Sequence, residues 1–303
     1  MTAATDFDRP ATAPAFQQLS GARKAKNRIA TVLVGATFVL ALVPLVWLLV
    51  TVISKGFEHV LNGDWWQKSL AGLTSRQFGG GVYHAILGTL LQGLVCAVIA
   101  VPIAIMVAIY LVEYGKRSRL AKAVTFTVDI LSGVPSIVAA LFIYALWITT
   151  MGQPRSAFAV SLALVLLMIP VVVRTTEELL KIVPDELREA AYALGIPKWK
   201  TIVKIVIPTA MSGIITGISL AIARVMGETA PVLVLVGYTT FINYNPFGGS
   251  MASLPLLMTS ERLTTNEVGE ARVWGAAVTL ILIITVFNLL GSLISKMTSL
   301  KTK

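Results

Sequence analysis

Cysteine, histidine and charged residues are all scarce in this chain. A single cysteine among 303 residues, Cys96, excludes an intramolecular disulfide, and the two histidines, His59 and His84, are not spaced as a metal site. Only 13% of the residues are charged, whereas 56% are hydrophobic and the mean hydropathy is +0.80. This balance excludes a soluble domain and predicts an all-α polytopic protein embedded in membrane lipid.

A nucleotide-binding loop is also missing. Gly115-Lys116 is followed by Arg117 and lacks the upstream glycine of a Walker A motif, so we do not expect this chain to hydrolyse ATP or to be an enzyme. The net charge of +10 does not predict a nucleic-acid partner, because most basic residues lie in tails and in short loops beside apolar runs. No metal or cofactor bound by the chain is expected.

Long apolar runs predict six transmembrane helices. We expect a flexible N-terminal tail over 1–28, a first helix and its outer loop over 29–81, a membrane core over 82–295 and a C-terminal tail over 296–303. Within the core, a polar segment at 174–207 separates the fourth span from the fifth. The core spans are expected at about 82–112, 123–150, 157–173, 208–237 and 273–295.

The distribution of basic residues predicts the orientation. With an even number of spans, both termini lie on one side of the membrane, and most of the 25 basic residues then fall in the two tails, in the short loop near Lys116 and in the segment 174–207. Because positively charged loops stay in the cytoplasm, we expect both termini to be cytoplasmic in a multi-pass protein of the cell (inner) membrane.

Two opposite charges inside the fifth apolar run indicate a site. Arg224 lies near the middle of the run, where an arginine costs about 2.5–3.5 kcal/mol to insert. Glu228 follows four residues later, so in a continuous helix both side chains share one face. Pro231 crowds the carbonyl of Gly227, so we expect the helix to bend beside the pair. Such charges mark a pathway or a ligand site, or they pair with each other and stabilise packing.

The polar segment 174–207 has the pattern of a helical hairpin. Pro184 suits a first helical position and Gly195 suits the position after a helix end, and a second helix is expected from Pro197 toward Pro208. Glu189-Ala190-Ala191, then Gly195, then Ile205-Val206-Ile207-Pro208 resembles the EAA motif of ABC importer permeases. The resemblance implies a type I importer (MetI-like) permease fold, in which Glu189, Ala190, Ala191 and Gly195 form a coupling helix seated on a separate ATPase.

Several longer strings resemble PstA-type phosphate permease subunits. They are Ala223 to Pro231, Arg174-Thr175-Thr176-Glu177-Glu178, Val183 to Ala191, and Gly133-Val134-Pro135-Ser136. The resemblance implies that Arg224 and Arg174 are functionally important. It also implies a PstC-type permease, a PstB-type ATPase dimer that binds ATP and Mg²⁺, and a PstS-type phosphate-binding protein as partners.

The chemistry of the charged pair agrees with phosphate. Arginine offers a planar fork for an oxyanion, and a carboxylate beside it accepts a hydrogen bond from protonated phosphate but repels sulfate. We expect a pathway that includes Arg224, Glu228, Thr229, Arg174 and Ser136, while Asp129 is expected to pair with a basic residue such as Arg174. Two alternatives stay open. One is a permease for another oxyanion, and the other is an autonomous proton-coupled carrier that uses Glu228 and Asp129 as relays.

Overall fold

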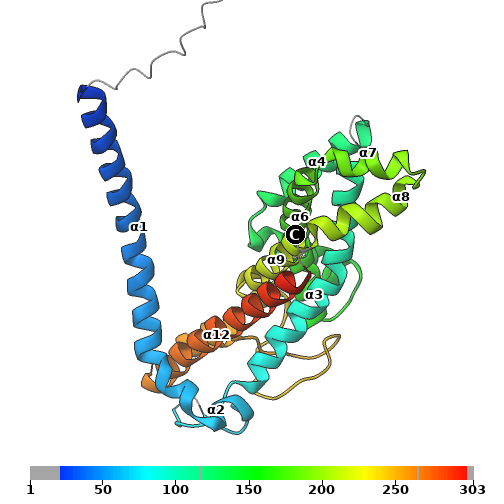
Figure 1. Ribbon diagram of the computed structural model, residues 1–303. Helices are drawn as coiled ribbons and strands as arrows, with labels where there is room; N and C mark the ends of the chain where they lie inside the picture. Colours follow the sequence, from blue (N-terminus) through cyan, green and yellow to red (C-terminus); the bar gives the residue numbers. More distant parts are fainter. Residues whose placement is uncertain (1–20, 75, 116–117, 265, 299–303) are drawn as a thin grey trace, which may run out of the picture. The chain divides into compact units, whose positions relative to one another are not determined.

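The computed structural model describes residues 21–74, 76–115, 118–264 and 266–298. The chain divides into two compact units, residues 1–51 and 52–303. Five helices in the described residues are long and apolar enough to cross a membrane, and a sixth crossing results if one sharply bent helix pair is counted as a span. This agrees with the expected all-α polytopic architecture (Figure 1).

Helix α1 (Gly21–Leu61) runs from the first unit into the second and includes the predicted first span. The helix begins within the predicted flexible tail, because Ala22, Arg23, Lys24 and Ala25 are good helix formers. Residues 1–20 of that tail lie outside the described residues. In the first unit, the apolar side chains of α1, for example Phe38 and Trp47, are exposed.

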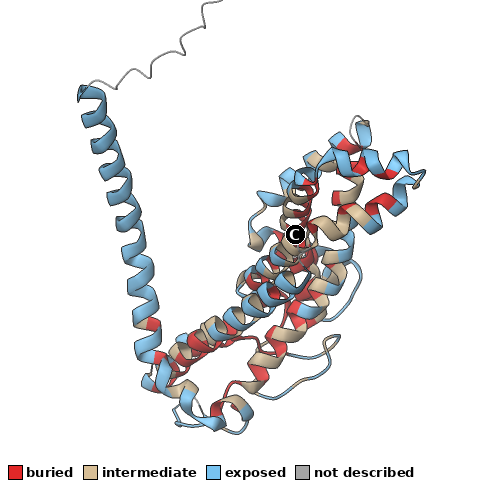
Figure 2. Ribbon diagram, viewed as in Figure 1, coloured by how far each residue is buried: buried red, intermediate tan, exposed pale blue. Residues whose placement is uncertain are grey.

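Helices α3 (Tyr83–Ile109) and α6 (Ala157–Ile182) form the centre of the second unit. α3 continues into a short π-helix, η1 (Tyr110–Tyr114). Both helices are largely buried (Figure 2), and many of their buried residues are small, which allows two helix backbones to approach closely. These small residues include Cys96, Ala100 and Ala104 on α3 and Ala157, Ala159 and Ala163 on α6.

The predicted third span, 123–150, is broken rather than merely kinked. Helix α4 (Arg119–Ser132) and helix α5 (Ser136–Ile143), which continues as the π-helix η2 (Tyr144–Thr150), meet at an angle of 107°. Gly133 ends α4, and Pro135 stands at the N-cap of α5 with extended ψ. A proline cannot donate to the preceding turn and disfavours helical geometry in the residue before it, so the helix cannot continue.

The predicted hairpin forms from α7 (Asp185–Ala193) and α8 (Lys198–Thr201), which lie at one end of the second unit (Figure 1). Gly195 has φ +74°, a left-handed conformation that glycine adopts without strain. The predicted second helix and the fifth span expected from Pro208 are parts of one helix. α8 continues through the π-helix η3 (Ile202–Val206) into α9 (Ile207–Met226), so Pro208 lies inside a continuous helix, directly after a π-helical turn.

Four further helices complete the second unit. α2 (Gly63–Gln67) and α11 (Leu254–Arg262) lie at the end opposite α7, where their residues Trp65, Leu254 and Leu257 belong to one buried cluster. α10 (Ala230–Leu235) follows α9. α12 (Glu267–Thr298) begins before the expected start of the sixth span and includes the first residues of the predicted C-terminal tail, whose residues 299–303 lie outside the described residues.

Helix α12 packs along α9. The Ser295 hydroxyl donates to the Ser212 carbonyl at 2.7 Å. A Cβ atom on Gly291 would lie 2.0 Å from Ser219 Oγ, so only a glycine permits this approach. At the α2 end, Arg272 of α12 and Glu261 of α11 form a buried ion pair at 3.1 Å. The contacts of Ser295 and Gly291 hold α12 against α9, which carries Arg224, and the ion pair holds α12 against α11.

Candidate functional site

The helix that carries Arg224 ends two residues later. α9 ends at Met226, and α10 begins at Ala230, with Gly227, Glu228 and Thr229 between them. The predicted continuous span at 208–237, with both charges on one helical face, is therefore wrong. Gly227 has low helix propensity, and Pro231 removes one backbone donor and crowds the Gly227 carbonyl, which together favour a break over a bend.

The two charged side chains have different surroundings. Arg224 is exposed in the last turn of α9, whereas Glu228 is partly buried and lines a small pocket. Among the described residues, no ion pair joins Arg224 to Glu228 and neither side chain has a hydrogen-bond partner. The alternative in which they hold each other is therefore not realised in this conformation. Thr229 is the N-cap of α10, but its side chain makes no capping hydrogen bond.

Sequence reasoning did not find the polar residues around Glu228. Its pocket is also lined by Thr89 and Gln92 of α3 and by Ser253, which precedes α11. Gln92 and Ser253 are buried, and Gln92 Nε2 and Ser253 Oγ have no hydrogen-bond partner. Gln92 is marked in the sequence only as a polar residue within an apolar run. Ser253 lies in a long loop, where no sequence signal marks it.

Arg174 belongs to a separate polar cluster. Its guanidinium contacts the Asp129 carboxylate of α4 and donates to Glu177 Oε2 at 2.8 Å, and Lys181 bonds the other Glu177 oxygen at 2.7 Å. The predicted pairing of Asp129 with Arg174 is confirmed. Ser136, in the first turn of α5, is partly buried, and no contact among the described residues joins it or Arg174 to Arg224 or Glu228.

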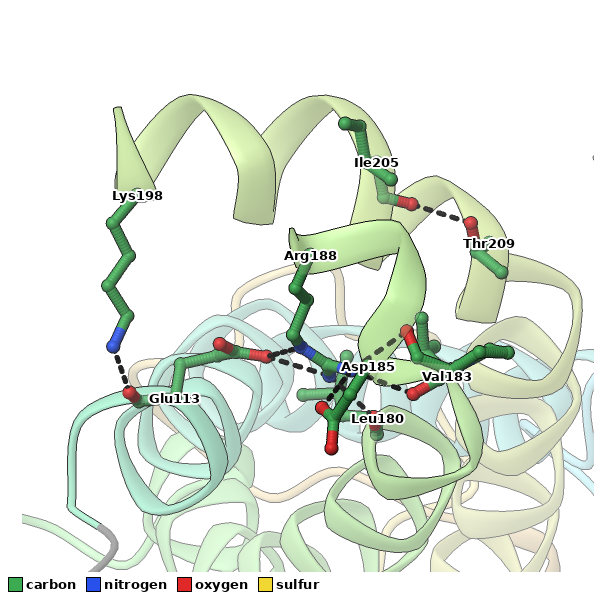
Figure 3. Close-up of polar contacts among 9 residues, drawn as sticks. Glu113, Leu180, Val183, Asp185, Arg188, Lys198, Ile205 and Thr209 are labelled. Atoms are coloured by element: carbon green, nitrogen blue, oxygen red, sulfur yellow. Dashed lines mark hydrogen bonds and ion pairs between the residues drawn. The ribbon is translucent and has the colours of Figure 1, made fainter. Parts of the chain in front are cut away.

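Helix α7 is fastened to the end of α3 by Arg188. Its Nε and Nη2 donate to Glu113 Oε1 at 3.0 and 2.9 Å, and both side chains are buried (Figure 3). Arg188 also donates to the carbonyls of Leu180 and Val183. Lys198 of α8 donates to the Glu113 carbonyl from the other side of the hairpin. Both helices of the hairpin therefore contact one residue, Glu113, at the end of α3.

The predicted coupling residues divide into exposed and buried. Glu189, Ala190 and Gly195 are exposed, whereas Ala191 is 2% exposed and packs within the chain. A small side chain at 191 thus serves the approach of α7 to its own subunit. The exposed face of the hairpin also carries large apolar side chains that no described residue covers. These are Leu187, Tyr192, Leu194 and Trp199.

Comparison with known proteins decides the family. Residues 100–300 match the family model described as "Binding-protein-dependent transport system inner membrane component". The chain is 58% identical over 288 residues to phosphate transport system permease protein PstA 1 of Mycobacterium tuberculosis, covering 95% of this chain and 94% of that one. It is 40% identical over 275 residues to PstA of Yersinia pestis, covering 90% of each. The chain belongs to the PstA family of permeases.

Similarity to solved structures identifies the fold of this PstA-family chain. A chain of the MetNI methionine ABC transporter in inward-facing conformations matches with TM-score 0.58 and 17% identity, over 73% of this chain and 95% of that one. A chain of a bacterial ABC transporter that imports alginate matches with TM-score 0.61 and 14% identity, over 92% and 98%. The expected type I importer permease fold is confirmed, and α7 of the PstA-family chain occupies the predicted coupling segment.

Proposed function

We propose that this chain is the membrane-spanning permease subunit of an ATP-driven importer of inorganic phosphate. Its membership of the PstA family and the names of its relatives support the substrate. The subunit works with a second, PstC-type permease, a PstB-type ATPase dimer that holds ATP and Mg²⁺, and a PstS-type phosphate-binding protein. The permease itself performs no covalent chemistry and binds no cofactor of its own.

The hairpin of α7 and α8 passes movement of the ATPases to the membrane helices. Arg188 and Lys198 connect the two hairpin helices to Glu113 at the end of α3, and α8 is continuous with α9. A displacement of the exposed residues Glu189, Ala190 and Gly195 therefore reaches α3 and α9 directly. These two helices carry Gln92 and Arg224, so the same displacement changes the surroundings of the Glu228 pocket.

The break between α9 and α10 is the observation that supports the proposed substrate site. It leaves the Arg224 guanidinium and the Glu228 carboxylate without partners at membrane depth, where an unpaired charge is costly and non-helical backbone is tolerated only beside protein or a cavity. Arg224 supplies donors for an oxyanion, and Glu228 accepts a hydrogen bond from the P–OH group that phosphate keeps near neutral pH. Sulfate has no such group, so Glu228 repels it.

The substrate proposal is tested in the complete transporter in proteoliposomes. Glu228→Gln is expected to preserve the volume of the side chain but to reduce exclusion of sulfate, and Arg224→Lys is expected to reduce phosphate uptake because it loses the planar fork. Uptake of labelled phosphate is measured with and without competing sulfate. Unchanged phosphate uptake and unchanged sulfate exclusion in Glu228→Gln would contradict the role of the carboxylate.

The remaining pathway residues act at a distance from the break. Arg174 holds α4 to α6 through Asp129, and Ser136 and Thr229 stand at the starts of two short helices that follow breaks in the chain. We place Arg174, Ser136 and Thr229 along the pathway rather than in one binding site. The proton-coupled carrier loses support, because Asp129 is committed to Arg174 and does not line the Glu228 pocket.

Orientation in the cell membrane is tested by labelling introduced cysteines. We expect both termini and α7 in the cytoplasm, so Glu186→Cys is shielded and Gln153→Cys, in the exposed turn before α6, reacts with an impermeant maleimide in whole cells. The native thiol, Cys96, is buried and gives a low background. Labelling of Glu186→Cys in place of Gln153→Cys would reverse the assignment.

A further inference from the structure

Polar side chains from three separate parts of the chain meet in the otherwise apolar pocket that contains Glu228. Thr89 and Gln92 come from α3, Glu228 from the break between α9 and α10, and Ser253 from the segment before α11. Its volume is about 10 Å³, which is room for roughly one water molecule and too little for a tetrahedral oxyanion.

Two hydrogen-bonding groups in this pocket are left without partners. Gln92 is 3% exposed and Ser253 is 1% exposed, yet Gln92 Nε2 and Ser253 Oγ make no hydrogen bond. Leaving a buried donor unsatisfied costs about 1–3 kcal/mol, and such groups are rare in native proteins. Two of them beside an unpaired carboxylate are difficult to explain by packing, because an apolar residue at either position would avoid the cost.

One side-chain hydrogen bond joins two walls of the pocket, α3 and the segment before α11. The segment before α11 touches α3 closely at Gly88, and the Leu254 N–H donates to Thr89 Oγ1 at 2.8 Å. On the other side, the flexible Met226 side chain covers Gly93. Moving the segment before α11 away from α3 breaks this Thr89 hydrogen bond and exposes the donors of Gln92 and Ser253 together with Glu228.

We infer that Gln92 and Ser253 are oxyanion-binding residues that donate to the transported phosphate when this pocket opens. The inference rests on the proposed function and assigns two neutral donors to the same site as Glu228. Gln92 Nε2 and Ser253 Oγ bind unprotonated phosphate oxygens, and the Glu228 carboxylate accepts from the protonated one. Neutral donors bind the anion without adding a charge that would hold it too tightly to be released.

Ser253→Ala and an isosteric Gln92→Met test the inference in the complete transporter. Ser253→Ala removes only an unsatisfied hydroxyl, so it is expected to fold at least as well as the parent chain. The measurement is the amount of phosphate imported per ATP hydrolysed, at saturating phosphate-binding protein. We expect this ratio to fall about fivefold in each variant, as one neutral hydrogen bond implies, while ATP hydrolysis continues.

Thr176→Val is the matched control. Thr176 of α6 is also buried and its hydroxyl also lacks a partner, but it does not line this pocket. The control is expected to keep the parental ratio. An equal loss in Thr176→Val would overturn the inference, because any buried hydroxyl would then matter, and so would an unchanged ratio in both pocket variants. A parent transporter that imports no phosphate would instead contradict the proposed function, and this inference with it.

Discussion

Arg188 of α7 and Glu113 at the end of α3 form a buried ion pair, with Nη2 of the arginine 2.9 Å from Oε1 of the glutamate. They are 75 residues apart in sequence. The arginine also donates hydrogen bonds to the backbone carbonyls of Leu180 and Val183, which have no partner within the helix at the end of α6. The pair therefore joins three helix ends, and it does so beside the exposed surface assigned to the ATPase.

Removing one partner of this pair is expected to loosen the hairpin. Glu113→Gln or Arg188→Gln alone leaves a buried charge uncompensated, which costs about 3–5 kcal/mol. Apolar replacement of both residues, Glu113→Leu with Arg188→Met, is expected to recover much of that stability. Thermal unfolding of the purified subunit in detergent measures its stability. The yield of assembled complex measures whether the hairpin still binds the ATPase. Equal melting of parent and single variants would contradict a structural role for the pair.

Gly195 is expected to be essential for its backbone conformation. Its φ of +74° is a left-handed one, and apart from the adjacent residues no heavy atom lies within 4 Å of the position a Cβ would take. Gly195→Ala therefore costs about 1–2 kcal/mol by strain alone. The control is Gly152→Ala, with φ +64° and equally open surroundings, in the turn before α6. Both variants should lose similar stability, but only Gly195→Ala should reduce phosphate uptake driven by the ATPase.

Gly88 is expected to tolerate no side chain, for a different reason. A Cβ atom there would lie 1.8 Å from the Ala252 carbonyl oxygen, so the backbone of the segment before α11 must shift. Overpacking of this kind costs about 1–3 kcal/mol. In the control, Gly133→Ala, the nearest atom is 3.6 Å away. A lower melting temperature is expected for Gly88→Ala alone, and equal melting of the two variants would contradict the close approach.

Asp129 and Arg174 are expected to contribute unequally. Their contact is partly exposed, so Asp129→Asn should change stability by less than about 1 kcal/mol. Arg174→Gln also removes the partner of Glu177, which is mostly buried, and is expected to destabilise the protein more. Melting temperatures of the two single variants and the double variant measure this. If Arg174 acted only through Asp129, the double variant would be no worse than Asp129→Asn.

The sequence predicted the architecture well where a single local signal decided it. Pro184 and Gly195 mark the boundaries of α7 because each restricts its own backbone, and the apolar runs locate the spans by length. Asp129 was assigned to Arg174 because a charge near a membrane needs a partner. The EAA-like motif and the strings around Arg224 predicted the family correctly.

Prediction was weaker where several weak signals compete. The fifth span was expected to begin at Pro208, but α8, η3 and α9 form one continuous helix that passes through this proline directly after a π-helical turn. Gly227 and Pro231 separately suggested a bend, and together they break the helix. No local pattern distinguishes a bent helix from a broken one, because neighbouring helices decide whether the freed backbone groups find hydrogen-bond partners.

The sequence by itself determined that this is a membrane permease of the PstA family, with a coupling hairpin and two charges in its fifth apolar run. Only the tertiary structure decided that Arg224 and Glu228 do not share a helix, and that Gln92 and Ser253 join Glu228 in one pocket. The physical reason is the range of each interaction. Hydropathy and helix termini act within a few residues, whereas burial of a polar group depends on segments more than a hundred residues apart.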